Sequence, residues 1–258
     1  MSILSQKTQD ADNKSLQILI VDDEPSLRDV LGKQLKSEGH LVHIKHSGNS
    51  ALQFLLQQSV DLVISDMKMA DGDGIFLLAK VRELMPNTPV LLMSGYTDIP
   101  TYEAFHQGAV AVLKKPFNLD ELLESVQKHT LSKEERWKDT PPQGEHKKLV
   151  AHFAKGLSSE IKSRNIAVGY GGFSLKTQEN YQEGEKINFA IAFAQGDIRH
   201  LQGSGNILWC RPVSDVEFIC GIEIECLDDQ YRAIWLDFIS LNSCRIYLPN
   251  LNSLKVLK

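Results

Sequence analysis

Residues 17–130 alternate short apolar runs with longer segments whose apolar residues recur every three or four positions. The short runs predict β-strands, and the longer period predicts amphipathic helices, so this half reads as five βα units. Strands that are apolar throughout are typical of a parallel sheet covered by helices on both faces. The predicted strands are Gln17–Val21, Leu41–Lys45, Asp61–Ser65, Val90–Met93 and Val110–Leu113. The predicted helices are Pro25–Ser37, Asn49–Gln57, Gly74–Leu84, Asp98–Gln107 and Leu119–Lys128.

The period changes to two in the second half, which predicts an antiparallel sheet or a small β-barrel. Glycine-rich turns are expected at Gly169–Gly172 and Gly203–Gly205, and one amphipathic helix at Asp229–Ser240, with Tyr231, Ile234, Trp235, Phe238 and Ile239 on its apolar face. The predicted strands of this half are Lys186–Ala194, Gly205–Arg211 and Glu217–Cys226.

Charged residues and two prolines interrupt both patterns between residues 131 and 145, which indicates a linker. We therefore expect a loose polar tail at 1–15, an α/β domain at 16–130, the linker, and a β-rich domain at 146–258.

Composition narrows the function classes. The chain has 258 residues, 42% hydrophobic and 24% charged, and a net charge of −5 whose acidic excess lies in residues 1–130. Neither half has the basic excess of a nucleic-acid binder, and we expect no DNA binding. No apolar stretch has membrane-spanning length, and the first fifteen residues lack the features of a secretory signal. These features predict a cytoplasmic protein.

The four cysteines all lie in the second half, without a C-x-x-C pair or a histidine at zinc-ligand spacing. We expect them to be reduced, buried thiols on strands. They are Cys210, Cys220, Cys226 and Cys244.

Polar side chains follow four of the predicted parallel strands. Asp22 and Asp23 end the first strand, and Asp66 ends the third. Ser94 follows the fourth strand, and Lys115 follows the fifth. Ligands of open α/β sheets bind beyond the carboxyl ends of the strands, so we expect these five side chains to converge on one site.

This donor set favours a hard divalent cation. Carboxylates about 4 Å apart repel by about 4 kcal/mol at an effective dielectric of 20, and a cation relieves that repulsion. Magnesium takes oxygen ligands and is commonly shared with a phosphate, whereas no histidine or cysteine here favours zinc. With the ion in place, Asp66 has the chemistry of a carboxylate nucleophile toward a phosphoryl group. Asp71–Gly74 also has calcium-loop character, but Ile75 occupies a ligand position, so we interpret it as a turn.

The first half resembles the receiver domain of two-component response regulators, which has a flavodoxin-like fold. The matching stretches, in order, are ILIVDDEPSLRDVL, DLVISDMKMADGDGIFLL, VLLMSGYTD and GAVAVLKKPFNLDEL. The resemblance implies phosphorylation on Asp66 by a sensor histidine kinase or phosphotransfer protein. It also implies Mg²⁺ ligation by Asp22, Asp23, Asp66 and the backbone carbonyl of Lys68, with Ser94 and Lys115 sensing the phosphate. One departure is Val112, which stands where family members often carry an aromatic switch residue.

The second half resembles the PilZ domain, a small β-barrel with a trailing helix that often binds cyclic di-GMP. The resemblance rests on G-G-F, E-G-E-K-I, the tryptophan strand and G-I-E-I. Binding in that family depends on R-x-x-x-R and [D/N]-x-S-x-x-G, because arginine forks hold phosphates and stack on guanine. This chain lacks R-x-x-x-R, and alignment of either Gly171 and Gly172 or Asn165 with the second motif loses essential groups.

We therefore expect a degenerate PilZ-like domain that acts through an unidentified output protein. The alternative is a dual sensor of phosphorylation and cyclic di-GMP, for which Lys148 and Arg164 would be the nucleotide-binding candidates. No catalytic triad, metal-hydrolase motif or nucleotide loop is present, so no enzymatic output is expected. Phosphorylation is expected to act by changing dimerisation or domain contacts.

Overall fold

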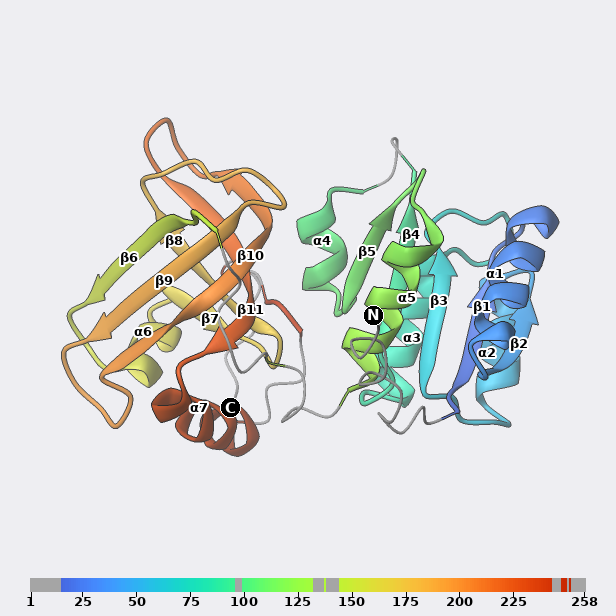
Figure 1. Cartoon of the computed structure of the whole chain (residues 1–258), viewed down its shortest axis with the longest axis horizontal. Helices are drawn as coiled ribbons and strands as arrows, with labels where there is room; N and C mark the ends of the chain where they lie inside the picture. The colour runs from blue at the N-terminus through green and yellow to red at the C-terminus, as the bar shows by residue number, and fades with distance from the viewer. Residues whose placement is uncertain are drawn as a thin grey trace, which may run out of the picture.

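The computed structural model describes residues 15–95, 99–131, 137, 144–242, 247–249 and 251. Two sheets of five and six strands form two domains that lie side by side (Figure 1). The linker predicted at 131–145 lies largely outside the described residues, and Cys244 lies outside them.

The first sheet is parallel, with the strand order β2-β1-β3-β4-β5. Each strand lies within one residue of its predicted bounds. This agreement follows from apolar runs that are long enough to be recognised and are buried on both faces of the sheet. The strands are β1 (Gln17–Val21), β2 (Leu41–Lys45), β3 (Leu62–Asp66), β4 (Val90–Ser94) and β5 (Ala111–Lys114).

Five helices cover the two faces of this sheet. Helices α1 (Pro25–Ser37) and α5 (Leu119–Thr130) pack against Ile18 and Ile20 on one face. Helices α2 (Gly48–Leu55), α3 (Gly74–Leu84) and α4 (Thr101–His106) pack against the opposite face. The strand order and the two apolar layers are those of a flavodoxin-like sheet.

Local capping explains where several of these helices begin. Pro25 occupies the first turn of α1, where its missing N–H costs nothing. The side chain of Asn118 accepts from the backbone N–H of Glu121 at 2.8 Å and so caps the first turn of α5.

The C-terminal domain is a curled six-stranded sheet with the order β6-β9-β10-β11-β8-β7. The three predicted strands, β9, β10 and β11, pair in the expected antiparallel sense. The sheet as a whole is mixed rather than antiparallel, because β6, which was not predicted, pairs with β9 in parallel. The other pairs are antiparallel. The strands are β6 (Lys147–Phe153), β7 (Ile166–Val168), β8 (Gly172–Thr177), β9 (Lys186–Phe193), β10 (His200–Pro212) and β11 (Phe218–Leu227).

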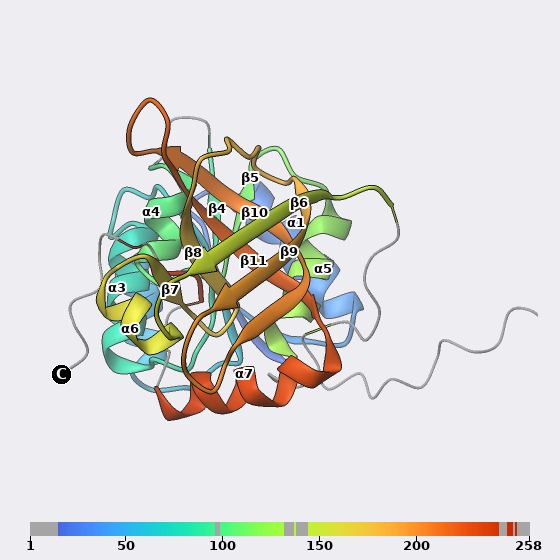
Figure 2. The same ribbon diagram turned by 90° about the vertical axis from the view of Figure 1, so that its left-hand side faces the viewer.

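Two helices accompany this sheet, the short α6 (Leu157–Lys162) and α7 (Asp229–Leu241) (Figure 2). Trp235 and Ile239 of α7 are buried in the domain core, where Trp235 meets Phe173 at a ring distance of 6.4 Å. Ile234 was predicted on the same face but is 42% exposed.

Two further predictions for this half are wrong. Gly203–Gly205 lies inside β10 and is not a turn. A side chain at Gly203 would meet the carbonyl oxygen of Cys226 at 2.1 Å, so the close approach of neighbouring strands explains the glycine there. Cys210 and Cys220, predicted to be reduced, form a disulfide between β10 and β11. Cys226 is buried, as expected.

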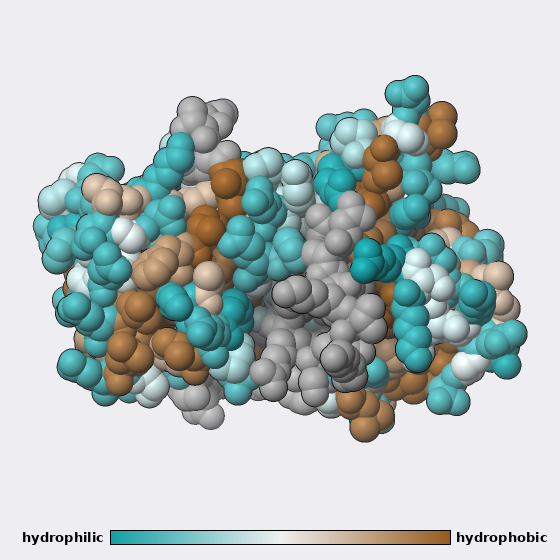
Figure 3. Space-filling model, turned by 180° about the vertical axis from the view of Figure 1, so that it is seen from behind, coloured by the Kyte–Doolittle hydropathy of each residue, from teal (hydrophilic) through white to brown (hydrophobic). Residues whose placement is uncertain are grey.

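The surface seen from behind carries apolar residues in several separate patches among hydrophilic ones (Figure 3). Across the part of the chain that the structure describes, no helix combines the length and apolar character needed to cross a bilayer.

Candidate functional site

Asp22 and Asp66 lie at the same edge of the parallel sheet because their strands are direct neighbours. Val21 of β1 is in register with Ser65 of β3, so the next residue of each strand carries a carboxylate. The side chains are almost fully buried, with Asp22 1% and Asp66 8% exposed as residues. Two buried carboxylates at one edge require a compensating cation.

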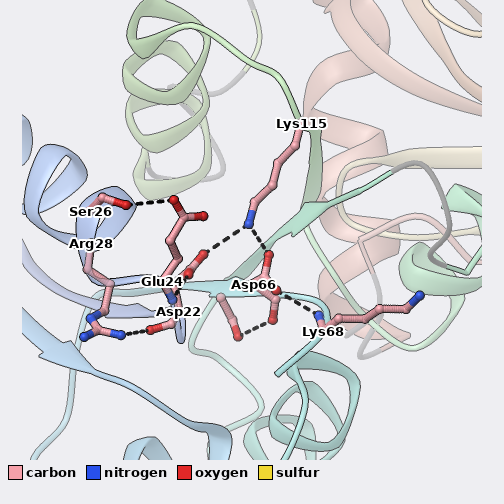
Figure 4. A network of polar contacts seen from close by, with 8 residues as sticks. Asp22, Glu24, Ser26, Arg28, Asp66, Lys68 and Lys115 are labelled. Carbon is pink, nitrogen blue, oxygen red and sulfur yellow. Dashed lines mark hydrogen bonds and ion pairs between the residues drawn. The ribbon is translucent and has the colours of Figure 1, made fainter. Parts of the chain in front are cut away.

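Lys115 supplies that positive charge in the structure. Its Nζ lies 3.2 Å from Oδ2 of Asp22 and donates to Oδ1 of Asp66 (Figure 4). The lysine reaches this position because its own backbone N–H bonds the carbonyl of Ser94 at 2.7 Å, directly after β5. The sequence-predicted convergence of positions 22, 66 and 115 is therefore present as one ion cluster.

Backbone groups hold each carboxylate in place. The N–H of Glu24 donates to Asp22 Oδ1 at 2.7 Å, and the N–H of Lys68 donates to Asp66 Oδ2 at 3.0 Å. The side chain of Lys68 extends away from the cluster (Figure 4), so this lysine contributes through its backbone.

Arg28 is a member of the site that sequence reasoning missed. Its guanidinium donates to the backbone carbonyl of Asp22 from the first turn of α1. An arginine on a helix surface is ordinarily a solvated charge, so no sequence signal distinguished this one.

Burial and mutual attraction both shift the pKa values of Asp66 and Lys115. Burial raises the pKa of Asp66 above its ordinary value, and the hydrogen bond and charge of Lys115 only partly oppose that effect. Burial alone would lower the pKa of Lys115, but the two aspartates outweigh it and hold that pKa above the ordinary range. Lys115 therefore stays charged, and the carboxylate of Asp66 is more basic than that of an ordinary exposed aspartate.

Tight packing fixes the loop that carries Asp66. A Cβ at Gly74 would lie 2.2 Å from the carbonyl oxygen of Asp66, so only glycine allows α3 to start this close to β3. Asp73 caps α3 by accepting from the N–H of Phe76 at 2.7 Å. Asp71 accepts from the side chain of Asn49 at 2.6 Å. These contacts give the Asp71–Gly74 segment a structural role as the start of α3.

Ser94 and Asp23 lie at the same edge but outside the ion cluster. Ser94 is 7% exposed and donates to the carbonyl of Gly95 at 3.2 Å. With Lys115 it lines a cavity of about 330 Å³ that also reaches Pro100 and Thr101. Asp23 is exposed beside Asp22.

Two of the predicted magnesium ligands are positioned to hold a hard cation such as Mg²⁺. Asp22 and Asp66 already share one positive charge, which is the electrostatic requirement of a magnesium site. Among the described residues, however, no three His, Cys, Asp or Glu side chains gather closely enough to hold a metal ion. Asp22 and Asp66 are thus the direct candidates for magnesium ligands. The other two predicted ligands, Asp23 and the backbone carbonyl of Lys68, lie next to them in the chain.

The two nucleotide-binding candidates come from opposite ends of the strand order in the C-terminal domain. Lys148 lies on β6 and Arg164 lies in the turn before β7. Arg164 has a positive φ of 58°, which places it in the left-handed region.

Comparison with known proteins identifies the domain family of the first half. A family model described as "Response regulator receiver domain" matches residues 18–127. The transcriptional regulatory protein GlrR of Escherichia coli (strain K12) is 35% identical over 132 residues, which are 49% of this chain and 30% of that protein. The transcriptional regulatory protein ZraR of the same strain is 37% identical over 115 residues, which are 44% of this chain and 26% of that protein.

The chain therefore spans less than a third of the length of these curated relatives. Among solved structures, a putative response regulator from Chloroflexus aurantiacus is 32% identical, with a TM-score of 0.43 over 45% of this chain and 98% of that one. On the family model and on the sequence identity of the curated relatives, residues 18–127 of this chain are a response regulator receiver domain.

Proposed function

We propose that this protein is a response regulator of a two-component phosphorelay, phosphorylated on Asp66 by a histidine kinase or phosphotransfer protein. The observation that carries the proposal is the Asp22–Lys115–Asp66 cluster, which places a buried, basic carboxylate beside a fixed ammonium. It lies at the carboxyl edge of the receiver sheet, where ligands of such folds bind.

The reaction is a phosphoryl transfer to a carboxylate. An oxygen of Asp66 forms a bond to phosphorus while the bond to the donor's leaving group breaks, and the electron pair leaves with the donor. Lys115 holds a phosphoryl oxygen by charge, and the hydroxyl of Ser94 turns from Gly95 to donate to another. When bound, a magnesium ion neutralises charge on the phosphoryl oxygens, held by Asp22, Asp66, Asp23 and the carbonyl of Lys68.

The output is proposed to be binding rather than catalysis. A curled sheet followed by α7 agrees with the PilZ-like character expected from the sequence, and we propose that this domain acts on a protein partner. The names of the relatives describe transcriptional regulators, but the chain spans too little of their length for that output to be transferred here.

Labelling with a small phosphodonor tests the proposal. Acetyl phosphate with Mg²⁺ is expected to add one phosphoryl group to the intact chain, detected by mass. Asp66→Asn should abolish the addition, whereas the matched control Asp29→Asn, an exposed carboxylate on α1, should leave it unchanged. Equal labelling of the Asp66→Asn variant would overturn the assignment.

A further inference from the structure

The boundary between the two domains encloses a cavity of about 450 Å³, which we call the interdomain cavity. Residues of β5 and α5 line it from the receiver, and residues of β10 and β11 line it from the C-terminal domain, across the boundary seen in Figure 1. Thr101 and Lys114 line both this cavity and the one beside Ser94, but Asp66 does not line it. Its volume lies within the range of about 300 to 1,000 Å³ that is usual for small-ligand pockets.

The walls of the interdomain cavity carry many apolar side chains. Ala111, Val112 and Leu113 of β5 are only partly buried, so the C-terminal domain covers this strand without packing tightly against it. Phe105 of α4 and Leu208 of β10 add further apolar surface to the lining. Walls of this kind favour a ligand with an apolar body.

Two ion pairs cross the domain boundary at this cavity. Lys114 Nζ lies 2.5 Å from Oε2 of Glu183, and Lys128 Nζ lies 2.5 Å from Oε2 of Glu223. All four residues line the cavity. Because each lysine is matched by one carboxylate, these pairs leave no surplus charge for a ligand.

Two further carboxylates, Glu121 and Glu124, give the lining an acidic excess. They lie three positions apart on α5, hence on one side of the helix, and both are exposed, so they stand where the cavity opens to solvent. Glu121 accepts from the neutral side-chain amide of Asn118 at 2.8 Å. Within the described part of the chain, no lysine or arginine forms an ion pair with either carboxylate. A protonated His129 would cancel only one of the two excess charges.

We propose that the interdomain cavity binds a small organic cation, in which a compact apolar body carries one ammonium or guanidinium group. The body lies against Val112 and Leu208, and Glu121 and Glu124 hold the charged group at the opening. An ionised carboxylate accepts hydrogen bonds and cannot donate them, so its partner must be a donor, and a positive one forms the stronger bond. Apolar walls beside charges of one sign focus the field and strengthen this attraction.

Other ligand classes fit this lining less well. An organic anion would meet an excess of carboxylates over lysines. A bare metal ion lacks a ligand set, because no three His, Cys, Asp or Glu side chains of the described residues gather closely enough to hold one. The inference goes beyond the proposed function and does not depend on phosphorylation of Asp66.

Three probes of similar shape test the charge requirement on the intact chain. They are 2-naphthylmethylamine, 2-naphthylmethanol and 2-naphthoate, which share an aromatic body and differ in charge. Titrations followed by saturation-transfer difference NMR measure their dissociation constants. The amine should bind with a Kd on the order of 1 mM, about fivefold more tightly than the alcohol, and the naphthoate should bind more weakly than both.

Glu121→Gln combined with Glu124→Gln removes the acidic excess at two exposed positions, where the fold should tolerate the change. The double variant should bind the amine about fivefold more weakly and the alcohol as before. Asp120→Asn is the matched control, because it neutralises an exposed carboxylate of the same helix that does not line the cavity. This control should leave all three dissociation constants unchanged.

Leu208→Phe tests the location of the site. The larger side chain should occupy part of the cavity and weaken binding of the amine and the alcohol alike, and the unfolding midpoint shows whether the variant is folded. If it is not folded, the double glutamine variant still decides the charge requirement.

The possible outcomes bear directly on the proposal. Equal affinity for the three probes would contradict the assignment of a cation. Unchanged binding of the amine in the double variant, or in a folded Leu208→Phe variant, would place the bound cation elsewhere and overturn the proposal. Absence of binding by every probe at millimolar concentration would show that the interdomain cavity is only a gap in packing.

Discussion

Lys128 Nζ lies 2.5 Å from the buried carboxylate of Glu223, which joins the last helix of the receiver domain to a central strand of the C-terminal domain. The two residues are 95 positions apart in the chain. Because a buried charge without its partner is costly, this contact ties the stability of the C-terminal domain to the position of α5.

Lys128→Met should therefore lower the free energy of unfolding by about 2 to 3 kcal/mol. This value is smaller than the loss of about 3 to 5 kcal/mol for breaking a fully buried ion pair, because the Lys128 side chain is 30% exposed and solvent screens its charge. A double-mutant cycle with Glu223→Gln, measured by urea unfolding, should give a coupling energy of about 1 to 3 kcal/mol. Additive effects of the two substitutions would show that the pair contributes nothing to stability.

The contacts of the Glu223 carboxylate also predict that the stability of the fold depends on pH. Burial alone would raise the pKa of Glu223, but Lys128, His129 and the Tyr247 hydroxyl outweigh it, so the folded-state pKa lies below the ordinary 4.5. A lowered carboxyl pKa stabilises the fold above the unfolded-state value and loses that stabilisation as the pH falls through the folded-state value.

The stability difference between the natural chain and Glu223→Gln should thus shrink as the pH falls below about 4.5. Urea unfolding of both proteins across this range measures it. A difference that grew below pH 4.5 would contradict the assigned direction of the pKa shift.

Gly74 should be intolerant of even the smallest side chain. A Cβ there would lie 2.2 Å from the carbonyl oxygen of Asp66, a backbone atom that cannot move without displacing the site. Gly74→Ala should cost about 1 to 3 kcal/mol of stability and slow the labelling of Asp66. Gly32→Ala is the matched control, because its Cβ would meet only the flexible end of Ile44 at 2.9 Å. Equal behaviour of the two variants would rule out this packing argument.

The disulfide between Cys210 and Cys220 should contribute measurably to stability. It links residues 10 positions apart, for which the loss of chain entropy in the unfolded state predicts about 2.5 to 3 kcal/mol. A reductant should lower the unfolding midpoint of the natural chain and leave Cys220→Ser unaffected. If the oxidised and reduced chains unfold at the same midpoint, the link contributes no stability.

The receiver fold and the core of its site could be predicted because local signals and tertiary structure agree there. Runs such as Ile18–Val21 are apolar throughout and end in a carboxylate, which locates both a central strand and its functional edge. Lys115 could be assigned to the same edge from its position after β5. Its bridging of Asp22 and Asp66 depends on side-chain reach, which the sequence does not reveal.

The C-terminal domain was harder to predict because its signals are weak or ambiguous. Strand β6 lies at the sheet edge with much of its length exposed, and β7 has only three residues, so neither shows a clear period. Glu223 alternates with apolar residues in a way that indicates a solvent-facing position. In the structure this carboxylate is buried against Lys128, His129 and Tyr247, all distant in the chain, which no local pattern records.

Borohydride trapping of the acyl phosphate tests the central claim most directly. The intact chain is treated with acetyl phosphate and Mg²⁺, and the aspartyl phosphate is reduced to homoserine and located by peptide sequencing. The account predicts homoserine at position 66, formed only with Mg²⁺ and lost in Asp22→Asn. Homoserine at another position, or none in a folded and magnesium-loaded chain, would contradict it.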